Sequence, residues 1–382
     1  MSFPNVELIS TETIKPSSPT PNHLRNFKLS LIDQITPPVF IPLTFFYQHD
    51  QLNHDNNQVK ISHSLKHSLS NILTMFYPLA GKLNQEKSSI DCNDAGAKYI
   101  EAQVNARLSE IIKDPKMEQL KLFIPVQPLD QTQKSILSVK ISFFTCGGIA
   151  IGICLSHKVA DGTSLVVSKV TQNTGITKEK IKTKRFVFDK EKLENIKQVV
   201  VSEELKSPTR VETVSAFILH NVFKKTKFAA VHAVNLRQRS IPPLPDHVFG
   251  NSWSYAIALL SEQDDKSISG CAKKLRAAIR IIDSEFIKEV KNGAYMSRYS
   301  ETTDLYSSGE IEFCIFSSWC RFPVYEVNFG WGKPVWACPT TLPFKNLVVL
   351  MSTPCGEGIE AWVNLVEEDM KLFDDKHHLM FL

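Results

Sequence analysis

Residues 149–156, IAIGICLS, constrain the fold more than any other stretch of the sequence. In a β-strand, alternate side chains point to opposite faces of the sheet. Here one set is isoleucine or leucine and most of the other is alanine, glycine or cysteine, so both faces are apolar or small. Such a strand is covered on both sides, and we expect it to lie in the interior of its sheet.

This strand is predicted to be the second arm of a hairpin. Residues 135–145 form the first arm, and a turn signal at residues 146–148, Cys-Gly-Gly, connects the two. The second arm ends at His157, so a rigid element delivers this histidine. From Thr163 onward the pattern becomes helical, with an apolar face at Leu165, Val166 and Val170.

The rest of the chain alternates between helical and strand periodicity. Residues 61–76 have apolar side chains at helical spacing, and Tyr77-Pro78 ends that helix. In the second half, residues 189–199 form a helix, and a capping box at Thr209 and Glu212 opens another. Strands follow at 229–236, 252–260, 310–319, 347–351 and 358–366. This alternation is typical of a mixed α/β protein.

The length of 382 residues exceeds the usual size of one compact core, so we expect two domains. Residues 171–185, TQNTGITKEKIKTKR, are polar and basic, and we interpret them as a linker. A localisation signal and an anion-binding patch are the alternatives. The predicted domains are then residues 1–170 and 186–382.

Composition and charge argue against several classes of protein. Hydrophobic residues make up 43% and charged residues 22%, as in ordinary globular proteins, and a net charge of +4 gives no reason to expect a nucleic-acid partner. No run is apolar enough for a membrane span, and the N-terminus lacks the features of a secretion signal. The eight cysteines contain no CxxC spacing, which favours reduced thiols and a cytoplasmic location.

Several common catalytic and metal-binding motifs do not occur in the sequence. It has no GxSxG nucleophile motif, no Walker loop and no HExxH. His63 and His67 are four residues apart on a predicted helix, but without a third ligand nearby we interpret them as part of a solvated face. His377 and His378 lie in a charged tail. We therefore expect no bound metal and no bound cofactor.

His157 remains as the candidate catalytic residue. It opens the sequence HKVADG, in which aspartate and glycine follow after three residues. Two interpretations compete. Either the imidazole closes a buried hydrogen-bond network, or it accepts a proton from a substrate.

A second motif, VNFGWGKP at residues 327–334, changes the balance between these interpretations. HKVADG and NFGWG resemble HxxxDG and DFGWG, the signatures of the plant BAHD acyltransferases. Further matching segments occur in the family's order: IKPSSPTP, FYPLAGKL, IDCND, AVNLR, GN at 250–251, SSWCR and GEGIEAW. The resemblance covers most of the chain and is closest to the branch of vinorine synthase and salutaridinol acetyltransferase.

The resemblance implies a fold like that of chloramphenicol acetyltransferase, with two mixed α/β domains, a long crossover and a tunnel between the domains. It implies that acyl-coenzyme A, in this branch acetyl-coenzyme A, enters from one side and a small-molecule alcohol or amine from the other. His157 would be the general base, because an imidazole with a pKa of about 6.5 is mostly neutral at pH 7. Transfer is then direct, without a covalent enzyme intermediate, and the enzyme is expected to be a monomer.

The resemblance also suggests roles for residues around this base. Asp161 either orients the imidazole in a dyad or pairs with Arg237, and we favour the ion pair because the turn directs the carboxylate back into the protein. Ser317 and Trp319 are candidates for the oxyanion or acyl site, with core packing as the alternative for Trp319. Structural support of the site is expected from Asp161, Gly162, Arg237, Asn328, Gly330 and Gly332.

The sequence departs from the family in two places. Asn328 stands where the motif begins with aspartate, and the stretch between Leu165 and Arg185 is much shorter than usual. We therefore weigh an active acyl-coenzyme A-dependent O-acyltransferase, acting on an alkaloid-like hydroxyl, against an impaired paralogue that binds coenzyme A or a metabolite without turnover. A purely structural protein explains the fixed histidine poorly.

Overall fold

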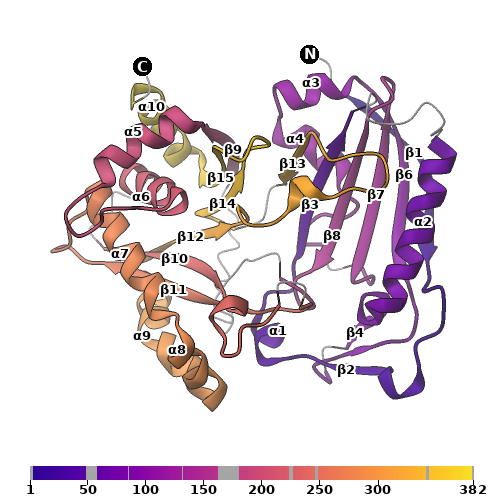
Figure 1. The fold of residues 1–382 in the computed structure, drawn as a ribbon, viewed down its shortest axis with the longest axis horizontal. Helices are drawn as coiled ribbons and strands as arrows, with labels where there is room; N and C mark the ends of the chain where they lie inside the picture. The colour runs from indigo at the N-terminus through magenta and orange to yellow at the C-terminus, as the bar shows by residue number, and fades with distance from the viewer. Residues whose placement is uncertain are drawn as a thin grey trace. The chain divides into compact units, whose positions relative to one another are not determined.

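The computed structural model describes residues 3–48, 58–84, 86–130, 132–161, 180–222, 227–245, 248–340 and 344–380. The chain divides into two compact units, each with its own large sheet (Figure 1). Unit 1 comprises Met1–Ala160 and Phe322–Leu342, and unit 2 comprises Asp161–Arg321 and Pro343–Leu382. Both units combine helices and strands, so the predicted mixed α/β fold is confirmed.

Unit 1 is built on a six-stranded sheet in the order β1-β6-β7-β8-β3-β13. β6 and β7 are parallel, and the other neighbours are antiparallel. The strands are β1 (Asn5–Ile14), β3 (Phe40–Tyr47), β6 (Ala97–Asn105), β7 (Leu137–Phe144), β8 (Ile149–Ser156) and β13 (Trp336–Pro339). A small second sheet contains β2 (Asn26–Lys28), β5 (Ser89–Asp91) and β4 (Lys82–Asn84).

The predicted hairpin and the interior position of its second strand are both confirmed. β7 and β8 pair antiparallel, with Leu137 opposite Leu155. β8 pairs with β3 along its other edge, so it lies inside the sheet. A Cβ at Gly152 would lie 2.0 Å from the carbonyl oxygen of Phe123. Only glycine therefore allows the backbone of the segment at Phe123 to cover this face of β8 so closely.

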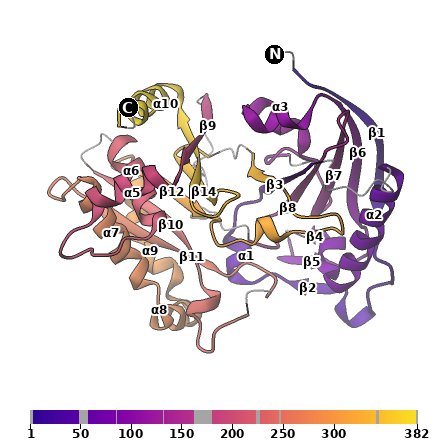
Figure 2. The same ribbon diagram turned by 45° about the horizontal axis from the view of Figure 1, so that its top comes forward.

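Helix α2 (Gln58–Met75) covers part of one face of this sheet (Figures 1 and 2). It confirms the predicted helix, and its buried residues recur at helical spacing: Ile61, Ser62, Leu65, Leu69 and Leu73. Lys66 pairs with Glu12 of β1 at 2.7 Å and with Glu101 of β6 at 2.6 Å. The shorter helices are α1 (Leu31–Ile35), α3 (Leu108–Lys113) and α4 (Met117–Leu120).

The segment 322–342 belongs to unit 1, although it lies within the second domain predicted from the sequence. β13 pairs antiparallel with β3, placing Trp336 opposite Phe46, and the two rings stack with centroids 5.2 Å apart. Pairing with a strand far away in the sequence therefore determines where this segment folds. The predicted domain 186–382 differs from the structure here, and the NFGWG motif lies in unit 1.

Unit 2 is built on a six-stranded sheet in the order β11-β10-β12-β14-β15-β9. β10, β12 and β14 are parallel, and the other neighbours are antiparallel. The strands are β9 (Ile181–Phe188), β10 (Phe228–Asn235), β11 (Trp253–Leu260), β12 (Glu312–Ser318), β14 (Leu347–Ser352) and β15 (Ile359–Val366). All strands predicted from residue 229 onward are confirmed to within a few residues.

Helices α5, α6 and α7 gather along one side of this sheet (Figure 2). α6 begins with the predicted capping box, in which the Glu212 N–H donates to Thr209 Oγ1 at 3.2 Å and the Thr209 N–H donates to the Glu212 carboxylate at 2.7 Å. The helices of unit 2 are α5 (Lys190–Val200), α6 (Arg210–Val222), α7 (Ile268–Ile281), α8 (Ser284–Glu289), α9 (Tyr295–Ser307) and α10 (Glu367–Met380).

The predicted linker 171–185 lies mostly outside the described residues, which resume at 180. Residues 181–185 form the first part of β9, an edge strand paired with β15. Lys182 and Lys184 of this strand form ion pairs with acidic residues of α10. The basic pattern here therefore comes from an edge strand whose lysines contact a helix.

All eight cysteines lie among the described residues, and none of them is in a disulfide bond. Burial raises the pKa of Cys154 and of Cys271 to about 12, so both are protonated at neutral pH. In the described part of the chain, every helix is too short or too polar to cross a membrane.

Candidate active site around His157

His157 is held at the end of β8 by backbone hydrogen bonds. Its N–H donates to the carbonyl oxygen of Val39 at 2.9 Å, and the N–H of Ser156 donates to the carbonyl oxygen of Ile136 at 2.8 Å. The chain then turns, and the Val159 N–H donates to the Ser156 carbonyl at 3.1 Å. His157 is 0% exposed. The hairpin and the turn together fix its backbone.

One ring nitrogen of His157 has a contact that defines the tautomer. Nδ1 lies 3.2 Å from the carbonyl oxygen of Ala160. A carbonyl oxygen can only accept, so this contact is a hydrogen bond when Nδ1 carries the proton. In the neutral ring, Nε2 then has the lone pair. The turn therefore favours the tautomer in which Nε2 can accept a proton.

Asp161 and Arg237 form the ion pair that the sequence analysis favours. Nη1 and Nη2 of the guanidinium lie 2.9 and 3.1 Å from the two carboxylate oxygens, a two-point contact. The side chains of Arg237 and Asp161 are 7% and 10% exposed. The carboxylate also accepts the N–H of Ser252 at 2.9 Å. Both carboxylate oxygens are thus engaged within unit 2.

The same guanidinium fixes the loop that contains the GN sequence at 250–251. Arg237 Nε donates to the carbonyl oxygen of Val248 at 3.1 Å, and Nη2 donates to that of Gly250 at 2.7 Å. The backbone N–H of Arg237 donates to Oδ1 of Asn235 at 3.0 Å. The ion pair therefore links the start of unit 2 at Asp161 to a loop of the same unit.

Ser317 and Trp319 contact each other at the end of β12. The indole Nε1–H of Trp319 donates to Oγ of Ser317 at 3.0 Å. Ser317 is 0% exposed and Trp319 is 1% exposed. Because Ser317 Oγ accepts this bond, the hydroxyl can direct its own hydrogen at another acceptor. The indole N–H of Trp319 is used in this bond, whereas Ser317 keeps a hydroxyl hydrogen that it can donate.

The NFGWG motif forms a turn organised by Asn328. Its side-chain oxygen accepts the N–H of Gly330 at 2.8 Å and that of Gly332 at 3.0 Å. Both glycines have positive φ, 102° and 113°, where other residues are strained. Nearby, Trp331 packs edge-on against Tyr47 with centroids 6.2 Å apart. An amide oxygen thus accepts both bonds at the position where the family motif has a carboxylate.

Two further sets of residues from the sequence analysis are Gly162 with the stretch after it and the histidines of α2. Gly162 and the helical stretch expected after it lie outside the described residues. His63 and His67 lie on α2, where Nε2 of His67 contacts Asn71 at 3.3 Å. Among the residues that the structure describes, no three His, Cys, Asp or Glu side chains are grouped so that they could hold a metal ion.

Two contacts of the His157 turn could not be predicted from the sequence. One is the carbonyl oxygen of Ala160, which no residue type identifies because every residue has one. The other is Lys158, whose Nζ donates to the carbonyl oxygen of Gln34 at 2.7 Å, 124 residues away in the sequence. The only sequence signal is a lysine placed directly between the histidine and two apolar residues.

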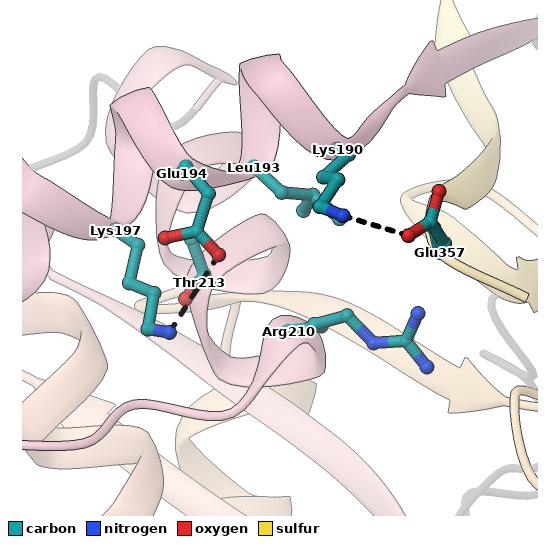
Figure 3. A pocket seen from close by; sticks show the side chains of 7 residues that line it. All are labelled: Lys190, Leu193, Glu194, Lys197, Arg210, Thr213 and Glu357. Atoms are coloured by element: carbon teal, nitrogen blue, oxygen red, sulfur yellow. Dashed lines mark hydrogen bonds and ion pairs between the residues drawn. The ribbon is translucent and has the colours of Figure 1, made fainter.

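A small hollow on unit 2 does not suit a large ligand. It encloses about 40 Å³, room for a few water molecules (Figure 3). Its charged side chains pair with one another: Lys190 contacts Glu357 at 2.8 Å and Lys197 contacts Glu194 at 3.8 Å, while Arg210 donates to a backbone carbonyl. We assign it no role in binding.

Comparison with known proteins identifies one family. The model of the Transferase family matches residues 4–167 and 166–380. Together these segments span nearly the whole chain. They meet at residues 166–167, within the stretch that we expect to be shorter than in the family.

Two curated relatives match over nearly their full length. Stemmadenine O-acetyltransferase of Catharanthus roseus is 39% identical over 418 residues, covering 97% of this chain and 96% of the relative. Vinorine synthase of Rauvolfia serpentina is 36% identical over 414 residues, with the same coverage of 97% and 96%. The first alignment has 418 positions and this chain 382 residues, so at least 36 residues of that relative have no counterpart here.

Solved structures give the same result. The crystal structure of vinorine synthase superimposes with a TM-score of 0.81 at 35% identity, covering 96% of each chain. F. sporotrichioides TRI101, complexed with coenzyme A and T-2, has a TM-score of 0.68 at 16% identity, covering 91% of this chain and 97% of that one. The second likeness is one of fold alone.

Proposed function

The chain belongs to the Transferase family, the BAHD acyltransferases, and we propose that it transfers an acetyl group from acetyl-coenzyme A to a hydroxyl group of a specialised metabolite. Relatives named as O-acetyltransferases of stemmadenine and of limonoids support acetyl as the acyl group and a hydroxyl as its acceptor. We propose more specifically that the acceptor is alkaloid-like.

The observation that carries the mechanism is the contact between His157 Nδ1 and the Ala160 carbonyl oxygen, at 3.2 Å. It leaves the lone pair on Nε2, and a general base needs that lone pair. An alcohol is a poor nucleophile at neutral pH, whereas a thioester carbonyl is already activated. A base that removes the hydroxyl proton during attack typically contributes about 10²–10⁴-fold to the rate.

The proposed reaction proceeds in two steps. Nε2 takes the hydroxyl proton while the oxygen bonds to the thioester carbon, which gives a tetrahedral oxyanion and an imidazolium. The carbon–sulfur bond then breaks, and the thiolate of coenzyme A receives the proton from Nε2. The products are an ester and free coenzyme A, and His157 returns to its starting tautomer.

We propose Ser317 as a hydrogen-bond donor to the oxyanion. Its Oγ already accepts from the Trp319 indole at 3.0 Å, and this bond polarises the hydroxyl toward donation. Losing one such donor typically costs about 10²–10³-fold in kcat. Ser317→Ala should therefore lower kcat strongly, and Trp319→Phe should have a smaller effect in the same direction.

The activity is tested by following the release of free thiol from acetyl-coenzyme A. Purified protein is incubated with a panel of alkaloid, terpenoid and phenolic alcohols, together with matched amines. His157→Ala and His157→Gln are the test variants. His220→Ala is the matched control, because Nδ1 of that exposed histidine also contacts a backbone carbonyl, at 2.8 Å from the oxygen of Lys266.

Thiol release that requires an acceptor, disappears in both His157 variants and persists in the control is the expected result. Full activity in His157→Ala would refute the role of the base. No release with any acceptor, combined with bound coenzyme A, would instead indicate the impaired paralogue. The intact turn at Asn328 gives that alternative no support.

We further propose that the enzyme is a cytoplasmic monomer with reduced thiols and no nucleic-acid or membrane partner. The cysteines, none of which is in a disulfide bond, support the part of this proposal that concerns reduced thiols. Size-exclusion chromatography with light scattering should give a single species of 43.1 kDa. A species of twice that mass would contradict it.

A further inference from the structure

Lys158 connects the turn that carries His157 to a distant segment of unit 1. Its Nζ donates to the carbonyl oxygen of Gln34 at 2.7 Å, although 124 residues separate the two. The side chain is half-buried, and this burial lowers the pKa of the ammonium group. A lysine held in this way has given up part of its hydration for one defined contact.

The acceptor of this contact lies near the end of helix α1. The last carbonyls of a helix have no partner within the helix and carry partial negative charge, so an ammonium group suits them. Asp33 of the same helix attracts Lys158 as well. Asp33 is itself fixed, because the Ser30 N–H donates to its carboxylate at 2.8 Å. Helix α1 therefore offers the ammonium group of Lys158 a carbonyl acceptor and a nearby carboxylate that is already held in place.

The segment that receives Lys158 is rigid. Thr36 is fully buried and its hydroxyl donates to the carbonyl oxygen of Ile32 at 2.6 Å. Pro37 and Pro38 follow, and each proline ring fixes its own φ. Val39 comes next and accepts the backbone N–H of His157 at 2.9 Å. The turn at His157 is thus attached to residues 34–39 at both ends of that segment.

We propose that Lys158 is a positioning residue for the general base, an inference that rests on the proposed role of His157. The Val39 contact fixes the backbone of His157, and the Val159 N–H holds the turn to Ser156 at 3.1 Å. The Lys158 contact adds a bond from this turn to helix α1 and helps to keep the Ala160 carbonyl within reach of Nδ1. Lys158 therefore maintains the tautomer of His157 without touching substrate.

The proposal predicts an effect on turnover rather than on binding. In Lys158→Met the Ala160 carbonyl moves, Nδ1 loses its acceptor for part of the time, and fewer molecules present the lone pair on Nε2. We expect kcat to fall about tenfold, because small displacements of catalytic groups carry large rate penalties. KM for acetyl-coenzyme A and for the acceptor should change less than about twofold. Lys158→Arg, which keeps the charge and the donors, should restore most of the rate.

Two comparisons separate positioning from general stability. Lys121→Met is the matched control, since Nζ of that lysine contacts only the nearby Glu118 side chain in the described hydrogen bonds, at 3.0 Å. The tautomer itself is read from ¹⁵N shifts of labelled histidine, with His157 assigned by comparison with His157→Gln. The expected result is a protonated Nδ1 in the wild type and in Lys158→Arg, and a mixed tautomer in Lys158→Met. Should Lys158→Met fail to fold, Lys158→Gln is measured instead.

Other outcomes overturn specific parts of this account. A rate loss that appears in KM, or a kcat loss with an unchanged tautomer, would refute positioning by Lys158. An unchanged rate in a folded Lys158→Met would refute it as well. If His157→Ala kept its activity, the proposed function would fail first. If His157→Ala were inactive and Lys158→Met fully active, only the inference about Lys158 would fail.

Discussion

Replacing Asp161 with asparagine separates a structural aspartate from a catalytic one. The carboxylate contacts Arg237 at 2.9 and 3.1 Å and accepts the Ser252 N–H at 2.9 Å. Asparagine has nearly the same shape but removes the charge and one of the two acceptor oxygens. The Arg237 guanidinium, 7% exposed, would then be buried without a counter-charge.

The expected loss of stability is large. Removing one partner of a buried ion pair typically costs about 3–5 kcal/mol, because the remaining charge stays desolvated. Arg237 keeps its bonds to the carbonyl oxygens of Val248 and Gly250, and the asparagine oxygen keeps one further bond. These contacts place the expected cost at the low end, about 3 kcal/mol.

Urea unfolding followed by tryptophan fluorescence measures this cost. With a slope of about 2–3 kcal/mol per molar, the midpoint should fall by about 1 M. Glu118→Gln, which breaks an exposed pair with Lys121, is the control and should cost less than about 0.5 kcal/mol.

The kcat of Asp161→Asn tests whether the role of Asp161 is structural. If Asp161 is structural, the folded variant should keep kcat within about tenfold of the wild type. Loss of the orienting aspartate in a true dyad lowers kcat by about 10⁴-fold. Unchanged stability combined with such a rate loss would show that Asp161 orients His157 after all.

Three further predictions concern other positions. Burial lowers the pKa of His232 from 6.5 to about 4, so the unfolded chain binds a proton at this histidine before the folded chain does as the pH falls. The free energy of unfolding, measured by urea titration, should therefore drop by about 2 kcal/mol between pH 7 and pH 5. His232→Gln should abolish that drop. Gly152→Ala places a Cβ 2.0 Å from the carbonyl oxygen of Phe123 and should lower the free energy of unfolding by about 3 kcal/mol in the same assay. A cost below about 1 kcal/mol would mean that the segment at Phe123 shifts easily. Asn328→Asp keeps an acceptor for both glycine N–H groups, so KM for acetyl-coenzyme A should stay within about twofold; a large decrease would show that the missing charge matters for the coenzyme.

Local patterns made much of the fold predictable. The hairpin of β7 and β8 follows from apolar alternation and a glycine turn, and the capping box of α6 follows from Thr209 and Glu212. Each signal lies within a few residues, so no distant contact is needed to read it. β8 could also be placed inside its sheet, because two apolar faces leave no other position for a strand.

Distant contacts account for what the sequence did not show. β13 has only four residues and is defined by pairing with β3, far earlier in the chain. The first part of β9 has the composition of a linker. It could not be recognised as a strand from its own residues, because the acidic partners of its lysines lie far away in the sequence, on α10. The Asp161–Arg237 pair was expected from the family resemblance and not from spacing, since 76 residues separate the two.

The candidate site likewise has features that could be predicted from the sequence and features that depend on distant contacts. His157 could be found because its motif is contiguous. Its tautomer could not, because that depends on the backbone oxygen of Ala160 and on the path of the turn. The bond between Trp319 and Ser317 likewise depends on side-chain orientation, which decides that the indole N–H is used within the protein.

The pairing of β13 with β3 has a consequence for how the polypeptide is made. The other strands of that sheet leave the ribosome first, whereas residues 336–339 emerge only after much of unit 2 has been synthesised. Until then one edge of β3 has exposed backbone groups, which invite pairing with neighbouring nascent chains. Messages that terminate before codon 336 should therefore yield insoluble protein, even though most of the first unit has been synthesised.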